Sequence, residues 1–282
     1  MYYDRKTQKI IEEIEYKQEK LEFLYNTKFG RFLLKFFVAS PIFSKICSLY
    51  QKSFFSKKDI KPFAKKYNIP LKEKDLKKFD TFNDFFTRRR PNILHKNKNE
   101  LVSIADAKLS YYNITDDLRL NIKNSNYSVN ELVENEKLAS FFKNGTCLVY
   151  RLAVNDNHRY NFIDDGKLAF NKKIKGKLHT VRPIAEKYNV FAQNSREVNF
   201  LNTKNLGYVM QIEVGALLVG KIKNHKKLTF KKNEEKGFFE FGGSTIIILL
   251  NKNIKFDSDI EEMNNKGIEI QVTAGERIGL IC

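Results

Sequence analysis

The sequence contains few cysteines, and their arrangement limits the chemistry available to the protein. Of 282 residues only three are cysteine, namely Cys47, Cys147 and Cys282. An odd number of thiols without the paired spacing of a zinc site predicts reduced cysteines rather than a disulfide framework or a metal centre. We therefore expect no bound metal.

Long apolar runs are also missing. No stretch of about 18 uncharged apolar residues is present, so we expect no helix that crosses a bilayer alone. The first twenty residues are charged throughout, which argues against a signal peptide and predicts a protein on the cytoplasmic side. Yet 42% of the residues are hydrophobic and 24 are phenylalanine, enough for one large or two small packed domains.

Acidic residues are outnumbered, with 33 Asp and Glu against 51 Lys and Arg. The excess is concentrated in residues 1–100, which hold 24 basic and 12 acidic residues. This imbalance predicts an anionic partner, either nucleic acid or an acidic membrane surface. No nucleic-acid-binding motif accompanies the charge, so we expect a membrane surface and no nucleic acid.

The basic N-terminal third has helical periodicity. Residues 8–25 predict an exposed amphipathic helix, and the aromatic segment 28–50 predicts two short helices broken at Pro41. Such a segment suits the interface of an anionic membrane, although its rings could equally pack on the protein's own core. The predicted membrane-binding residues are Phe32, Lys35, Phe36, Phe37 and Lys45. Thr81 is a predicted N-cap of a helix that turns Phe82, Phe85 and Phe86 inward.

Short β-runs with turn signals follow from about residue 98. They are 101–104, 109–114, 146–154, 167–173, 208–214, 217–222, 238–241, 246–250 and 268–272. The chain therefore predicts an α+β fold in which a helical, membrane-facing N-terminal region, residues 1–98, packs on a mainly antiparallel β catalytic core, residues 99–282.

The segment 237–250 contains the most unusual chemistry of the sequence. Gly242 and Gly243 separate an aromatic run from Ser244, Thr245 and five apolar residues. Two glycines can twist the Gly243–Ser244 peptide open to attack by the Ser244 hydroxyl, although a β-hairpin turn is the simpler interpretation of four residues. An N→O acyl shift, elimination and hydrolysis would cut the chain and leave a pyruvoyl group at residue 244. Such a ketone forms a Schiff base with an amine and accepts the electrons of a leaving carboxylate.

Seven motifs in order resemble those of the pyruvoyl-dependent phosphatidylserine decarboxylases. They are Phe82-Asn-Asp-Phe-Phe-Thr-Arg-Arg, Val102-Ser-Ile-Ala-Asp106-Ala-Lys, Asp156-Asn-His158-Arg-Tyr-Asn161, Gly176-Lys-Leu-His-Thr-Val-Arg-Pro, Asn194-Ser-Arg-Glu197, Glu213-Val-Gly-Ala216-Leu-Leu-Val-Gly220 and Glu235-Lys-Gly-Phe-Phe-Glu-Phe-Gly-Gly-Ser-Thr245. Each motif alone is weak, but together they cover most of the chain in register.

The resemblance implies a proenzyme that cuts itself before Ser244. The catalytic core is then divided into 99–243, the end of the large chain, and 244–282, a small chain that carries the pyruvoyl group made from Ser244. The two chains form a heterodimer, and a further dimer of such heterodimers is left open. The implied reaction converts phosphatidylserine to phosphatidylethanolamine by a peripheral protein on the cytoplasmic face of the cell membrane.

The same resemblance assigns roles to individual residues. Asp106 and Ser244 match two members of the family's self-cleavage Asp-His-Ser triad, and His158 matches the histidine that serves decarboxylation. A histidine near a carbanion is a suitable proton donor at neutral pH.

One position departs from the family pattern. Asn161 stands where a second histidine is expected, and asparagine cannot take up a proton at neutral pH. Three routes to activating Ser244 remain open: His158 serves both steps, His179 reaches in, or Asn161 only orients a strained bond. The alternative function is an unprocessed lipid-binding homologue of the same fold.

Overall fold

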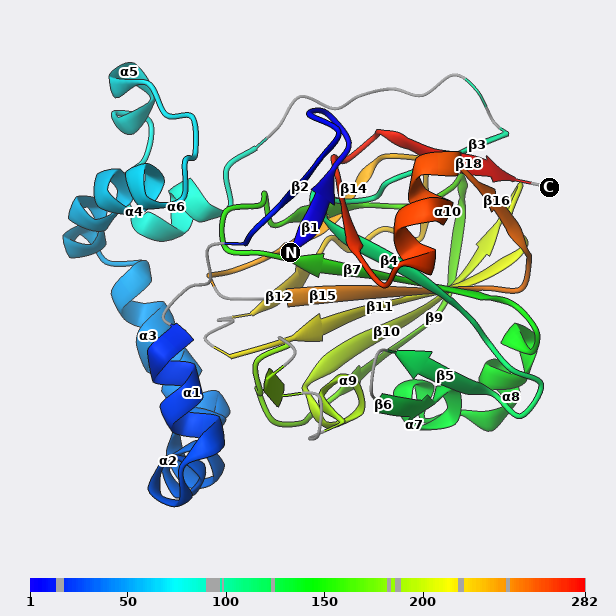
Figure 1. Ribbon diagram of the computed structural model, residues 1–282, viewed down its shortest axis with the longest axis horizontal. Helices are drawn as coiled ribbons and strands as arrows, with labels where there is room; N and C mark the ends of the chain where they lie inside the picture. The colour runs from blue at the N-terminus through cyan, green and yellow to red at the C-terminus, as the bar shows by residue number, and fades with distance from the viewer. Residues whose placement is uncertain are drawn as a thin grey trace.

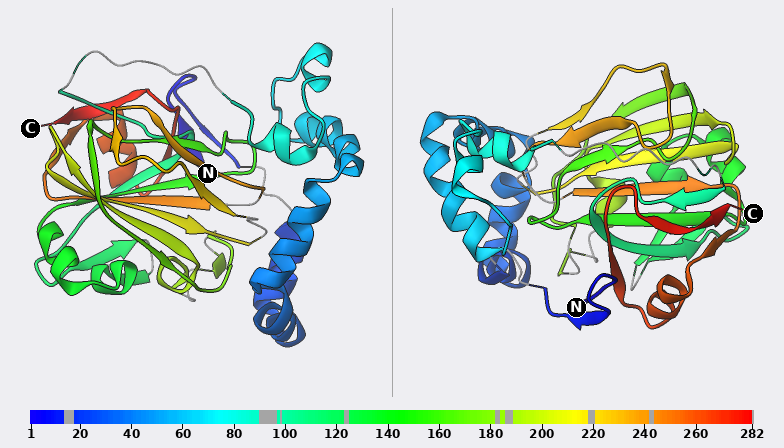
Figure 2. Two further views of the ribbon diagram at one scale, coloured as in Figure 1. Left: turned by 180° about the vertical axis from the view of Figure 1, so that it is seen from behind. Right: turned by 90° about the horizontal axis from the view of Figure 1, so that it is seen from above.

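The computed structural model describes residues 1–13, 18–89, 97, 99–122, 125–181, 184–185, 189–217, 221–241 and 244–281. Figure 1 shows a column of helices from the N-terminal third standing beside a β-rich body formed by the remainder of the chain. The views from behind and from above in Figure 2 give the same division. The predicted α+β class, with a largely antiparallel β core, is confirmed.

The helical column contains six α-helices and two short irregular helices among its described residues. They are α1 (Gln18–Asn26), α2 (Lys28–Leu33), the π-helical turn η1 (Leu34–Val38), α3 (Pro41–Gln51), the 3₁₀ helix η2 (Phe54–Asp59), α4 (Ile60–Lys66), α5 (Glu73–Leu76) and α6 (Phe82–Phe86). The predicted break at Pro41 is confirmed, because α3 begins there with the Ser40 side chain as its cap. Proline has no amide hydrogen to continue the preceding helix, but it suits a first helical turn.

The last helix of the column, α6, attaches it to the β body. Thr81 and Asp84 form a reciprocal capping box at its start, as the predicted Thr81 cap requires. The three phenylalanines of α6 are at most 2% exposed, which confirms their predicted inward direction. They join a hydrophobic cluster that also contains Ile60, Phe63, Ala64, Tyr67, Val154 and Phe241. Two members of this cluster, Val154 and Phe241, belong to the β body.

The β body is organised by a ten-stranded sheet in the order β13-β9-β10-β11-β15-β7-β4-β17-β1-β2. Every neighbouring pair is antiparallel except β1 with β17. The strands are β13 (Thr229–Phe230), β9 (Gly166–Ile174), β10 (Arg196–Thr203), β11 (Tyr208–Gly215), β15 (Ser244–Leu250), β7 (Thr146–Leu152), β4 (Ala107–Asn113), β17 (Glu269–Val272), β1 (Tyr2–Asp4) and β2 (Lys9–Ile11). β15 and β7 lie near the middle and are buried at every residue, so they form the centre of the core.

Smaller sheets and helices complete the body. The orders β12-β14-β8 and β16-β18-β3 describe two three-stranded sheets, and β5 pairs with β6. Their strands are β12 (Ile222–Asn224), β14 (Glu235–Phe239), β8 (Arg159–Asn161), β16 (Ile254–Phe256), β18 (Arg277–Ile281), β3 (Glu100–Val102), β5 (Arg119–Ile122) and β6 (Ser125–Ser128). The helices are α7 (Val129–Val133), α8 (Glu136–Ala139), η3 (Ser140–Phe142), α9 (Val190–Gln193) and α10 (Ser258–Asn265).

Some sequence-based expectations of secondary structure differ from the structure. The helix expected over residues 8–25 begins only at Gln18, because Lys9–Ile11 forms an edge strand paired with β1. Of the predicted strand 217–222, residues 218–220 lie outside the described residues, Leu217 and Lys221 are not in a strand, and Ile222 begins β12. β10 was not predicted, because its polar residues mask the apolar alternation of a strand. Those polar residues are nevertheless buried and hydrogen-bonded, as Arg196 and Asn199 show.

The chain before Ser244 does not form a β-hairpin. β14 pairs with β8 and β12, whereas β15 pairs with β7 and β11, so the two strands belong to different sheets. The hairpin interpretation is therefore wrong, and residues 240–243 connect one sheet to the other. Gly242 and Gly243, the predicted strained and scissile positions, lie outside the described residues.

Candidate active site

Ser244 is the first residue of β15 and is enclosed on both sides. It lies opposite Gly215 of β11 and opposite Leu152 of β7. The residue has no exposed surface, and its Oγ makes no hydrogen bond to any described residue. A buried hydroxyl without a partner is unfavourable in a purely structural role, which makes Ser244 a candidate for chemistry.

The loop after β7 carries His158 back toward this end of the sheet. The Asp156 carboxylate accepts a hydrogen bond from the Ala153 amide at 2.7 Å, which closes the loop. His158 Nδ1 lies 3.1 Å from the main-chain oxygen of Asp156. A carbonyl oxygen can only accept, so Nδ1 carries the proton and the lone pair of the neutral imidazole is on Nε2. His158 is fully buried and is suited to act as a base.

An aromatic ring from the helical column covers His158. The Phe86 ring centroid lies 4.0 Å from that of the imidazole and 5.0 Å from that of Phe241. Two main-chain oxygens just after α6 hold the same loop: that of Arg88 accepts from Asn157, and that of Thr87 accepts from Arg159. The helical column therefore keeps water from the imidazole.

Asp106 lies beside the His158 segment. Ala105 forms an antiparallel bridge with Tyr160, and the Asn161 amide donates to the Ile104 oxygen at 2.9 Å. In this register Asp106 is within one residue of the position opposite His158. The Asp106 carboxylate is buried and accepts a hydrogen bond from the Ala274 amide at 2.9 Å. The fold thus places the segments that carry Asp106 and His158, about 50 residues apart in sequence, side by side.

Asn161 lies at the other end of β8. Its Nδ2 donates to Asn233 Oδ1 at 2.7 Å, and it pairs with Glu235 of β14. The main-chain oxygen of His158, by contrast, accepts from Phe239, four residues nearer to Ser244 along the chain. Three residues of extended strand span roughly 10 Å. Within the described residues, the contacts of Asn161 therefore lie away from the end of the sheet that contains Ser244.

His179 lies on the β11 side of Ser244. Asn194 Nδ2 donates both to the His179 oxygen and to the oxygen of Gly215, which lies opposite Ser244. The imidazole Nδ1 is 3.2 Å from the Tyr25 hydroxyl of α1. Burial, with a smaller contribution from Lys177, lowers the pKa of His179 to about 4. The ring is therefore neutral at physiological pH.

Two buried ion pairs were not found from the sequence. Lys108 Nζ lies 3.1 Å from Asp156 Oδ2, and Lys236 Nζ lies 3.0 Å from Glu213 Oε2. Burial opposes ionisation of Asp156, but Lys108 and the Ala153 amide keep the pKa of its carboxyl below the ordinary value. Burial raises the pKa of Glu213 despite Lys236. Lys108 lies two residues after Asp106, and strand alternation could have placed both on one face.

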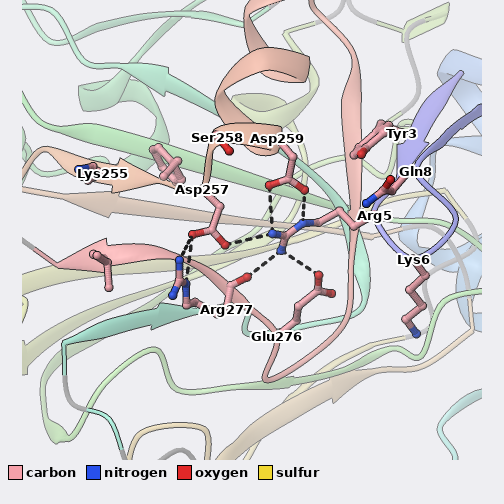
Figure 3. A pocket seen from close by; sticks show the side chains of 12 residues that line it. Tyr3, Arg5, Lys6, Gln8, Lys255, Asp257, Ser258, Asp259, Glu276 and Arg277 are labelled. Carbon is pink, nitrogen blue, oxygen red and sulfur yellow. Dashed lines mark hydrogen bonds and ion pairs between the residues drawn. The ribbon is translucent and has the colours of Figure 1, made fainter.

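A cavity of about 690 Å³ lies elsewhere, at the loop between β1 and β2. Figure 3 shows Arg5 at its centre, directed toward Asp257, Asp259 and Glu276. Asp257 also pairs with Arg277. These charges satisfy one another, and Ser244 and His158 are not among the lining residues. Among the described residues no group of three or more His, Cys, Asp or Glu side chains is arranged to hold a metal ion.

The helical column exposes many apolar side chains. Phe32, Phe36 and Phe37 are each more than half exposed, and Lys35 lies over the Phe36 ring at 5.4 Å. The other large exposed apolar residues of this surface include Phe29, Ile42, Ile46, Leu49, Phe54 and Phe55. Lys45 is exposed among them. Among the described helices, none is by itself long and apolar enough to cross a membrane, whereas the bent pair Lys28–Val38 and Ile42–Gln51 meets that criterion by length and composition.

Comparison with known proteins identifies the relatives of the chain. The family model for phosphatidylserine decarboxylase matches residues 82–280. Phosphatidylserine decarboxylase proenzyme 2 of Clostridium acetobutylicum is 51% identical over 282 residues, covering 98% of this chain and 97% of the relative. The phosphatidylserine decarboxylase proenzymes of Clostridium tetani and Clostridium perfringens are 39% and 38% identical, over 99% and 98% of this chain and 97% and 98% of their own.

Proposed function

Because the chain belongs to the phosphatidylserine decarboxylase family, we propose that it is a self-processing enzyme that converts phosphatidylserine to phosphatidylethanolamine and carbon dioxide. The observation that carries this proposal is the position of Ser244. It begins a central strand as a buried hydroxyl without a hydrogen bond to the described residues, at the end of the sheet where the His158 loop follows β7.

Maturation begins at the Ser244 hydroxyl. His158 Nε2 accepts the proton of Oγ as the oxygen attacks the carbonyl of residue 243, the C–N bond breaks to leave an ester, and the proton passes to the released amine of residue 244. His158 is favoured over Asn161 for this step, because its lone pair is on Nε2 while the Asn161 amide is bonded to Asn233. Asp106, within one residue of facing His158, stabilises the imidazolium formed on proton transfer.

Elimination of the ester and hydrolysis would leave a pyruvoyl group at residue 244. Because elimination removes Oγ with the carboxylate of residue 243 and leaves a methyl group in its place, the product fits a position where the serine hydroxyl makes no hydrogen bond to the described residues. The strand partners Gly215 and Leu152 would hold the residue in place. When present, this group supplies a carbonyl that takes the substrate amine and accepts the electrons released with carbon dioxide.

In turnover, His158 would give a proton to the substrate carbon that carbon dioxide leaves. The Phe86 ring packed against the imidazole and the Phe241 ring beside Phe86 keep the site dry. A dry site favours loss of a charged carboxylate and protects the carbon from adventitious protonation.

The small chain, residues 244–282, would remain docked after cleavage. Its strands β15, β17 and β18 each pair with strands of the large chain, and β15 and β17 lie between two of them. Arg5 of the large chain also pairs with Asp257, Asp259 and Glu276 of the small one (Figure 3). These contacts support a stable heterodimer of the two chains.

The exposed aromatic and basic surface of α2, η1 and α3 would bind an anionic membrane from the cytoplasmic side. Rings such as Phe36 and Phe37 suit the acyl boundary, and Lys35 and Lys45 suit the headgroups. The same column stacks Phe86 on His158, so the membrane-binding surface and the site belong to one connected unit. This arrangement suits a substrate that stays in the bilayer.

Intact-mass measurement of the purified protein tests the proposal. The wild type should give two masses, with residue 244 lighter than serine as a pyruvoyl group, and should release carbon dioxide from phosphatidylserine vesicles. Ser244→Ala should give one 282-residue mass and no carbon dioxide. A single uncut wild-type mass after long incubation would instead identify the unprocessed lipid-binding homologue.

A further inference from the structure

Lys108 is a fully buried cation for which the proposed reaction has no direct use. It lies on β4, whose first residue follows Asp106 directly. The side chain is 1% exposed, and its Nζ is 3.1 Å from Asp156 Oδ2. Burying a lysine costs free energy unless a carboxylate pairs with it. Removing either partner of this pair would therefore leave an unpaired buried charge.

Asp156 connects Lys108 to His158. Its carboxylate accepts from the Ala153 amide and, at 3.2 Å, from Gln271 Nε2 of β17. Its main-chain oxygen accepts the hydrogen bond from His158 Nδ1. One residue therefore carries both the anion that Lys108 holds and the carbonyl that fixes the imidazole.

We propose that Lys108 is a positioning residue for His158 that acts through Asp156. It holds the 153–158 loop in place, and it balances the Asp156 charge so that the imidazole stays neutral and able to accept a proton. The inference rests on the proposed function for the importance of His158, but the contacts themselves do not depend on it.

The other groups around the pair leave this balance to Lys108. From β1, the Tyr2 ring lies 4.9 Å from Lys108 Nζ, and burial raises the pKa of Tyr2, so its hydroxyl is neutral. From α6, Phe86 presents an uncharged ring to His158. Other charged groups near the pair among the described residues include Asp106 before β4, Arg151 on β7, which pairs with Glu13 and Glu269, and Arg159 of β8, which pairs with Glu235. Without Lys108, the Asp156 carboxylate would favour a charged His158.

A charge series tests the proposal by NMR titration of ¹⁵N-histidine-labelled protein, made on the uncut Ser244→Ala chain so that catalysis is not required. Lys108→Met should move the titration midpoint of His158 to higher pH, because it removes the cation that offsets the Asp156 charge while the Ala153 and Gln271 hydrogen bonds still favour the ionised carboxylate. Asp156→Asn should move it to lower pH, since Lys108 is then unbalanced. The double variant should return toward the parent value.

Charge balance shifts the His158 titration midpoint in opposite directions in the two single variants. Loss of structure would shift it in the same direction in both. Lys236→Met is the matched control, because it removes another buried lysine, paired with Glu213, and should leave the His158 midpoint in place. In the processed enzyme, where His158 donates a proton, the alkaline limb of the decarboxylation pH profile should follow the same order. An unchanged His158 midpoint in Lys108→Met, or shifts of one sign in both single variants, would overturn the inference. Absence of chain cleavage in the wild type would instead remove the proposed function and leave the titration result standing.

Discussion

The helical column and the β body differ in how far they bury their apolar side chains. In the β body, strands such as β7 and β15 are buried at every residue, with Ile246 and Leu249 inaccessible to solvent. The column packs one modest cluster around α4 and α6 and leaves rings such as Phe36 and Phe54 exposed. A soluble surface rarely carries so many apolar side chains together without a partner. The β body thus buries the larger core and holds the candidate site, and the column exposes the apolar surface that we propose binds a membrane.

The two regions meet at a few specific contacts, and each lies near the candidate site. Phe86 stacks on His158, Tyr25 contacts His179, and Lys52 pairs with Glu240. The Leu178 amide also donates to the Ala39 oxygen at 3.0 Å. The comparison therefore predicts that variants at these contacts affect both regions, whereas variants on the exposed surface affect partner binding alone.

The largest effect is expected at His158, on the β side of the main contact. His158→Ala should slow chain cleavage and reduce decarboxylation by about 10²–10⁴-fold, because it removes the group that carries protons in both steps. Intact mass over time and carbon dioxide release measure the two. His225→Ala, at an exposed histidine bonded to Glu235, is the control and should retain both. Cleavage of His158→Ala at the wild-type rate would transfer the base role to another group such as His179.

The next effect is expected at Phe86, on the helical side of the same contact. Phe86→Ala should destabilise the protein by about 3–5 kcal/mol, since it empties a buried site beside His158 and Phe241. Urea unfolding followed by fluorescence or circular dichroism measures the loss. Phe36→Ala, at an exposed ring, should change stability by no more than about 0.5 kcal/mol. Equal losses in both variants would remove the distinction between the two regions.

The contact between Tyr25 and His179 predicts a pH dependence of stability. Because the folded-state pKa of His179 is lowered to about 4, the unfolded chain binds its proton more readily between pH 6.5 and 4. The contribution of neutral His179 to the free energy of unfolding is fully present above pH 6.5. It decreases as the pH falls, and the loss reaches about 3 kcal/mol near pH 4. The difference in the free energy of unfolding between the wild type and His179→Asn, measured by urea unfolding, should therefore be smaller at low pH than at neutral pH. A constant difference at every pH would contradict this.

The smallest effect on the protein itself is expected on the exposed surface. Phe36→Glu with Phe37→Glu should leave stability and chain cleavage unchanged but weaken binding to anionic vesicles more than tenfold, because each charge near such a surface counts for about 1 kcal/mol. Co-sedimentation with phosphatidylserine-containing vesicles measures binding, and neutral vesicles are the control. Equal binding of the variant and the wild type would place the membrane contact elsewhere.

Local sequence signals determined much of this protein. The Pro41 break, the Thr81 cap and the strands β4, β7, β9, β11 and β15 depend on backbone chemistry and on apolar patterns over a few residues, so they could be predicted. The order of the motifs around Asp106, His158 and Ser244 likewise indicated the family, because their spacing along the chain is itself the signal.

Only the tertiary structure decided which of these pieces meet. That β14 and β15 belong to different sheets, that Lys9–Ile11 is a strand, and that Lys108 holds Asp156 all depend on partners far away in sequence. Strands are stabilised by neighbours supplied by other segments, and a buried lysine is tolerated only where a carboxylate arrives from another loop. Such long-range pairings have no local signature, which is why the residues around His158 appear only once the chain is folded.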